Sequence, residues 1–185
     1  MKRPLRRTYR SLFILLSLTG AAFAQQRSWR QVLDERLSLY GHRNWIVVAD
    51  SAYPLQSAPG IETILSTDSQ VDTIRQVFAE ISRRNQIRPV IYVDKELKYV
   101  EEQAAPGIGA FRQLLNGTLE KFFSGQAANP MLHEDIIKQL DQASKTFNVL
   151  IIKTNSLLPY TTLFLELRAG YWNDQAEEDL RRQMR

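Results

Sequence analysis

Short apolar runs alternate with stretches of helical spacing along this chain, and this alternation restricts the possible folds more than any other feature. The runs WIVVA at 45–49, VIYV at 90–93, VLII at 149–152 and the segment 161–167 are short and rich in β-branched or aromatic residues. Such runs are typical of buried strands, and a further short strand is expected at 61–65. Strands that alternate with helices predict a layered α/β domain with a partly parallel sheet.

The intervening stretches predict helices. The first covers 28–40, with Ser28 as its N-cap and Gly41 as its stop, and further helices are expected over about 68–85 and 133–145. Between them, apolar residues from 111 to 123 also follow helical spacing. Asn116 and Gly117 interrupt that last pattern, which leaves open one helix or two, and 124–130 is expected to be a loop.

The N-terminus has the pattern of a secretory signal peptide. A basic head is followed by the apolar run 11–24, which ends in the small-x-small triplet Ala22, Phe23, Ala24. The alternative is an uncleaved anchor, but the run is shorter than the roughly 20 residues that a spanning helix needs. We therefore expect cleavage before Gln25, no stable membrane insertion afterwards, and an exported protein, either periplasmic or secreted.

The charge balance argues against a nucleic-acid-binding protein. Five of the 24 Lys and Arg residues lie in the first ten residues, which leaves 19 basic against 20 acidic residues in the remainder. A nucleic-acid-binding domain is expected to carry a basic excess on its folded surface. The mature chain, 25–185, is instead a single domain of nearly balanced charge, with a charged tail at 173–185 that is expected to be a solvated helix or a frayed end.

Two polar residues flank the first strand. His42 lies just before it, and Asp50 follows its last residue. Ligands bind in the crevice outside the carboxyl ends of parallel strands, so Asp50 is placed to hydrogen-bond a polar ligand. The simpler alternative is that Asp50 caps a turn and His42 binds a loop carbonyl.

Two segments resemble the ribose pyranase and fucose mutarotase family. YGHRNWIVVADSAYP at 40–54 is similar to the family's Gly-His pair, short apolar strand, Ala-Asp ending and proline-bearing loop. TNSLLPYTT at 154–162, followed by LFLELRAG, resembles its closing signature, in which Tyr160 matches the signature tyrosine. Asn155 and Ser156 replace a Gly-Glu pair there, and Thr162 stands where the family has asparagine.

This resemblance implies an α/β/α sandwich and a monosaccharide isomerase without a metal or redox cofactor. Interconverting the ring forms of a sugar consists of proton transfers, for which a histidine that titrates near neutral pH is suited. His42 is the expected catalytic residue, and Asp50, Tyr160, Thr162 and His133 are the expected sugar-binding residues. His133 could instead be a helix-start histidine without a ligand. The resemblance also implies a homo-oligomer in which neighbouring copies complete each site.

The rival hypothesis is a secreted, non-catalytic sugar-binding or interaction protein with the same fold. The changes at Asn155, Ser156 and Thr162 favour it. Catalysis is expected if Tyr160 and Thr162 share a pocket with His42 and Asp50, and binding alone if Leu157 or Leu158 fills that pocket. The sequence contains no Gly-rich phosphate loop, His-Glu-x-x-His helix or Gly-x-Ser-x-Gly motif, which argues against nucleotide hydrolysis, zinc proteolysis and α/β-hydrolase chemistry.

Overall fold

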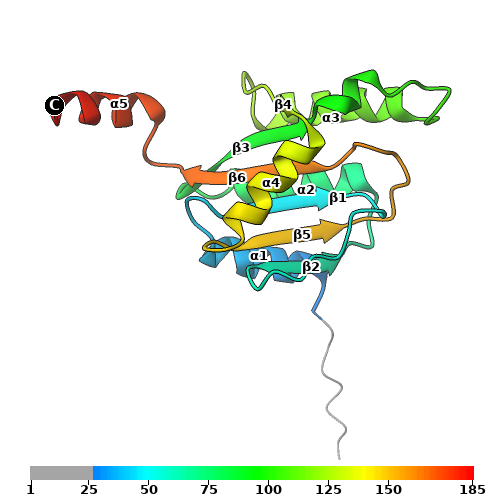
Figure 1. Cartoon of the computed structure of the whole chain (residues 1–185), viewed down its shortest axis with the longest axis horizontal. Coiled ribbons are helices and arrows are strands. Elements are labelled where there is room, and N and C mark those ends of the chain that lie inside the picture. The colour runs from blue at the N-terminus through cyan, green and yellow to red at the C-terminus, as the bar shows by residue number, and fades with distance from the viewer. Residues whose placement is uncertain (1–26) are drawn as a thin grey trace, which may run out of the picture.

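The structure is a computed structural model that describes residues 27–185, so the expected signal peptide lies outside the described residues. Figure 1 shows the order of the elements along the chain. They are α1 (Trp29–Leu39), β1 (Trp45–Ala49), β2 (Ile61–Leu65), α2 (Gln70–Ser82), β3 (Ile87–Asp94), the 3-10 helix η1 (Lys95–Tyr99), α3 (Ile108–Phe122), β4 (Asn129–Met131), α4 (His133–Ala143), β5 (Val149–Lys153), β6 (Leu163–Ala169) and α5 (Asp174–Gln183).

The strands form a mixed sheet in the order β2-β5-β1-β6-β3-β4. Strand β5 pairs parallel with β1 and with β2, and β3 pairs parallel with β4. Strand β6 lies antiparallel between β1 and β3. Five strands therefore point the same way and β6 points the opposite way, which confirms the predicted partly parallel sheet.

Helices cover both faces of this sheet, as expected for an α/β/α sandwich. The larger cluster of buried side chains joins one sheet face to α1, α2 and α3, and includes Leu33 and Phe78. The smaller cluster joins the other face to α4 through Ile136 and Leu140, and Figure 1 shows α4 lying across that face. Strand β1 is buried on both faces, which explains why its sequence is a continuous apolar run.

The structure settles one local alternative and contradicts one local prediction. Helix α3 continues through Asn116 and Gly117 instead of dividing, because Phe111, Leu115 and Leu119 are all buried along one of its sides. Burial of such side chains outweighs the cost of about 1 kcal/mol for an internal glycine. The expected loop at 124–130 also contains the start of β4, a three-residue edge strand too short to show a periodic pattern.

Other local predictions are confirmed. Ser28 caps α1 in a capping box with Gln31, and the charged tail forms α5, which contains no buried residue. Within residues 27–185, none of the helices is long and apolar enough to cross a membrane.

Two glycines allow a direct test of how closely the elements pack. A Cβ atom at Gly60 would lie 2.2 Å from the carbonyl oxygen of Ser144 and 2.7 Å from that of Phe147, whereas one at Gly117 would meet no atom within 4 Å. We expect Gly60→Ala to lower the free energy of unfolding by about 1–3 kcal/mol because backbone atoms must move apart. Gly117→Ala should raise it by about 0.5–1 kcal/mol because alanine favours the helix. Urea denaturation of both variants measures this contrast, and equal effects would contradict it.

Candidate active site

Polar side chains gather at the edge of the sheet where β1, β3 and β5 end. Because β6 runs the opposite way, the residues that precede it lie at this same edge. Asp50 follows β1, Asp94 is the last residue of β3, Thr162 precedes β6, and His133 is the first residue of α4. We call these four residues, together with Tyr160, the strand-end cluster.

Asp50 and Thr162 contact each other in this cluster. One Asp50 carboxylate oxygen accepts a hydrogen bond from the backbone N–H of Ala52 at 2.8 Å, so this residue does cap a turn. The other oxygen lies 3.4 Å from the hydroxyl of Thr162, a residue that is 2% exposed. The capping role that the sequence suggested and the contact with Thr162 therefore use different oxygens of one carboxylate.

Asp94 and His133 form the second contact of the cluster. The imidazole Nδ1 of His133 lies 3.0 Å from Oδ1 of Asp94, which is 1% exposed. Burial raises the pKa of Asp94 to about 6, and the nearby Glu96 and Asp50 raise it as well, while the hydrogen bond with His133 opposes the shift. A carboxylate at Nδ1 holds the proton there and leaves Nε2 free to exchange a proton with a ligand.

Neighbouring groups position this pair. The backbone N–H of His133 donates to both carboxylate oxygens of Glu96 at 3.2 Å, which holds the start of α4 against η1. The Tyr160 ring meets the imidazole edge-on, with the ring centroids 5.9 Å apart. Tyr160 has a φ of 55°, a left-handed conformation that is uncommon for residues other than glycine.

The turn that carries Tyr160 is fixed by a buried amide. Gln70 donates from its side-chain nitrogen to the backbone oxygen of Thr161. Its side-chain oxygen lies 3.3 Å from the hydroxyls of both Thr154 and Thr161. Gln70 thus ties α2 to both ends of the loop between β5 and β6. Leu157, in the middle of this loop, is 89% exposed, and Leu158 packs against the larger core cluster. Neither leucine fills the strand-end cluster.

His42 lies at the opposite edge of the sheet. The adjacent Arg43 donates its backbone N–H to Leu167 near the end of β6, and His42 shares a hollow with Arg168 and Ala169. Burial lowers the pKa of His42, and the positive charges of Arg168 and Arg43 lower it further. Strand β1 separates this residue from Asp50 by about 20 Å. The structure therefore brings Asp50, Tyr160, Thr162 and His133 together and separates His42 from them within one chain.

Sequence reasoning missed two members of the site region. Asp94 ends a buried strand in the same way as Asp50 does, so the same positional rule applied to VIYVD would have found it. Tyr53 is 4% exposed and its hydroxyl has no hydrogen-bond partner among the described residues. Burial raises its pKa, and the carboxylates of Asp141, Asp94 and Asp50 raise it further. No sequence pattern distinguished this tyrosine from an ordinary loop residue.

Within residues 27–185, no three His, Cys, Asp or Glu side chains gather in a way that could hold a metal ion.

Comparison with known proteins finds similarity in sequence and in fold. No family model matches the chain. It is 24% identical over 136 residues to D-ribose pyranase 2 of Rubrobacter xylanophilus, a match that covers 73% of this chain and 77% of that protein. Its fold is similar to that of Bacillus subtilis RbsD complexed with D-ribose, with a TM-score of 0.50 and 22% identity over 77% of this chain and 93% of that one. It is also similar to FucU from Bifidobacterium longum, with a TM-score of 0.51 and 13% identity over 73% and 92% of the two chains.

The fold is that of RbsD and FucU. In sequence the chain is also similar to a D-ribose pyranase, so both comparisons point to ribose pyranases and fucose mutarotases as its relatives.

Proposed function

We propose that this protein is a cofactor-independent isomerase that interconverts the pyranose, furanose or anomeric forms of a free monosaccharide. The observation that carries this proposal is the pairing of the buried Asp94 with the partly exposed His133, next to three hydrogen-bonding side chains at one edge of the sheet. The similarity to a D-ribose pyranase and to a ribose-bound RbsD supports a sugar as the ligand.

The chemistry requires two coupled proton transfers. To open a pyranose, a base removes the proton of the anomeric hydroxyl, the bond between C1 and the ring oxygen breaks, and an acid protonates that oxygen. Closure by another hydroxyl, or on the other face of the carbonyl, reverses these steps. His133 can take or give a proton at Nε2, while Asp94 stabilises the charged imidazole. Asp50, Thr162 and Tyr160 would bind the sugar hydroxyls.

His42 would act on the sugar from a second copy of the chain. A side chain about 20 Å away along the sheet cannot reach a sugar bound at the strand-end cluster. The two edges also differ in charge. Arg43, Arg88 and Arg168 lie beside His42, where Asp174 and Glu166 pair with the last two of them. Asp50, Asp94 and Glu96 lie at the cluster, with Lys95 nearby. Head-to-tail contacts of two different surfaces form rings where the rotation between copies closes, and every copy of such a ring supplies both halves of a site.

We also propose that the protein acts outside the cytoplasm, after removal of residues 1–24. The basic head, the apolar run and the Ala-Phe-Ala triplet support this. Intact-mass measurement of the protein purified from its native compartment should give a chain that begins at Gln25. A chain that retains Met1 would contradict cleavage.

Anomeric exchange measured by saturation-transfer NMR tests the isomerase directly. With ribose, fucose and a panel of other free sugars, we expect exchange faster than in buffer for at least one sugar. His133→Ala should reduce this rate by about 10²- to 10⁴-fold, the usual contribution of general acid-base catalysis. Lys138→Ala, an exposed change on the same helix, should leave the rate unchanged. Buffer-level exchange for every sugar would contradict the proposal.

A non-catalytic sugar-binding protein is the second candidate, and Thr162 favours it. A threonine hydroxyl offers one donor, whereas the asparagine amide at the corresponding family position donates and accepts at separate atoms. Sugar binding that shifts the His133 signals without accelerating exchange would support this candidate in place of the isomerase.

A further inference from the structure

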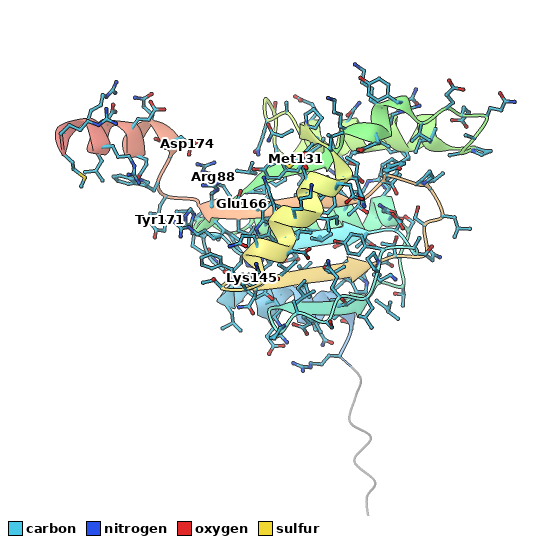
Figure 2. The ribbon with its side chains drawn as sticks, viewed as in Figure 1. Arg88, Met131, Lys145, Glu166, Tyr171 and Asp174 are labelled. Carbon is cyan, nitrogen blue, oxygen red and sulfur yellow. The ribbon has the colours of Figure 1, made fainter. Side chains whose placement is uncertain are left out.

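A hollow of about 520 Å³ lies between the His42 edge of the sheet and α5. Figure 2 shows Arg88 and Tyr171 between the end of β6 and Asp174 at the start of α5. His42, Arg43 and Arg168 form the sheet side of the hollow, and Trp172 and Arg181 belong to its α5 side. We call this space the arginine hollow.

The arginine hollow contains more donors than its own carboxylates satisfy. Arg88 pairs with Asp174 at 2.7 Å and Arg168 with Glu166 at 3.0 Å, and Arg181 pairs with Glu177. Within the described part of the chain, no carboxylate lies within ion-pair distance of Arg43, whose guanidinium instead lies over the Phe147 ring. The Nε atoms of Arg88 and Arg168 are buried without a hydrogen-bond partner. The side chains of Arg88 and Arg168 are otherwise 32% and 38% exposed, so their terminal N–H groups can donate to a ligand in the hollow.

Two aromatic side chains, Tyr171 and Trp172, also line the hollow. The Trp172 indole N–H donates to Glu177 at 2.9 Å, which fixes the ring against the start of α5. Trp172 is 42% exposed and Tyr171 is 81% exposed. Aromatic rings with one apolar face open to solvent can pack against the C–H face of a sugar. Arginines beside such rings fit a ligand that combines a sugar ring with a negative charge.

We infer that the arginine hollow binds the anionic group of an acidic monosaccharide, one that carries a carboxylate or a phosphate. Guanidinium groups bind both anions through paired N–H donors. The inference rests on the proposed function, because His42 of this edge would meet the sugar ring held by the strand-end cluster of the neighbouring copy. Arg43, Arg168 and Arg88 then select a charged substrate over a neutral sugar.

The two histidines allow a direct test, since the chain contains only His42 and His133. The imidazole signals of the purified protein would be followed by NMR during titration with glucuronate, glucose 6-phosphate and neutral glucose. We expect a charged sugar to shift the His42 signal and to raise the pKa of His42, because its anion offsets the adjacent arginines. Neutral glucose should bind about tenfold more weakly or worse. A response to glucuronate alone identifies a carboxylate site, and a response to glucose 6-phosphate alone identifies a phosphate site.

Two variants and one control complete this experiment. Arg43→Gln and Arg168→Gln should each weaken binding of the charged sugar by about tenfold, the usual loss for a charge-assisted hydrogen bond. The ratio of the affinity for the charged sugar to the affinity for glucose should fall accordingly. Arg75→Gln removes a charge from the exposed face of α2 and should change nothing. Equal binding of charged and neutral sugars, or binding of the acid that survives both variants, would overturn the inference.

Anomeric exchange recorded on the same samples separates this inference from the proposed function. Accelerated exchange of neutral sugars with no preference for acids would overturn the acidic-sugar inference and keep the isomerase. Binding of the acid at His42 without faster exchange of any sugar would keep the arginine hollow as an anion site and overturn the isomerase.

Discussion

Co-expression of His42→Ala with His133→Ala should restore sugar exchange that neither variant has alone. Each site would combine His42 from one copy with His133 from the next, so a mixed ring contains some sites in which both residues are intact. Random assembly of equal amounts predicts activity of about one quarter of the wild-type value. Differently tagged copies, purified through both tags, allow anomeric exchange to be measured on the mixed assembly alone.

A matched control uses two changes at the same edge. Co-expression of His133→Ala with Asp94→Asn should not restore sugar exchange. Both changes lie in the strand-end cluster, so every site of a mixed ring contains an altered cluster. If His42→Ala alone accelerated anomeric exchange as the wild type does, His42 would not be a catalytic residue. An inactive mixture of correctly assembled His42→Ala and His133→Ala would refute the shared site.

Asp94→Asn should lower the exchange rate by about 100-fold while the protein remains folded. The asparagine is nearly the same size but carries no charge, so it stabilises the protonated imidazole of His133 much less than a carboxylate does. The asparagine side-chain oxygen can still accept a hydrogen bond from Nδ1 of His133. The variant therefore loses the negative charge but keeps the hydrogen bond. Anomeric exchange measured against pH checks this, with Glu96→Gln as a control for the second carboxylate near His133.

The same substitution should also change how stability depends on pH. The pKa of Asp94 is raised to about 6 from the ordinary 3.8, so between these values the folded chain binds a proton that the unfolded chain releases. The free energy of unfolding should therefore fall by about 2 kcal/mol as pH rises from 4 to 7 on account of this residue. Asp94→Asn should lack that fall. Urea denaturation at the two pH values measures the difference, and an identical fall in both proteins would show that another group is responsible.

The sequence was most informative where a residue's neighbours along the chain determine its environment. The run at 45–49 predicted a strand buried on both faces because every residue in it is apolar. Asp50 could be placed at a ligand-binding edge because it follows that strand directly. Residues that directly follow a clear strand pattern could therefore be placed without knowledge of the order of the strands in the sheet.

The sequence was least informative where long-range pairing decides the outcome. The motif that contains His42 and Asp50 is continuous, yet the extended strand between them carries the two residues to opposite edges. The reversed direction of β6 brings Thr162 to the strand-end cluster and Arg168 to the His42 edge, and no local pattern in LFLELRA indicates that direction. Asp94 and His133 are 39 residues apart, so their contact depends on the pairing of β3 with β4.

The reversed strand β6 has a mechanical consequence for the proposed ring. Its first residues adjoin one half-site and its last residues adjoin the other, so one strand of seven residues connects the two. Each copy would therefore connect two consecutive sites through one continuous strand. A displacement of Thr162 when a sugar binds would be transmitted along β6 to Arg168 at the next site. Binding at one site would then change the geometry of the neighbouring site.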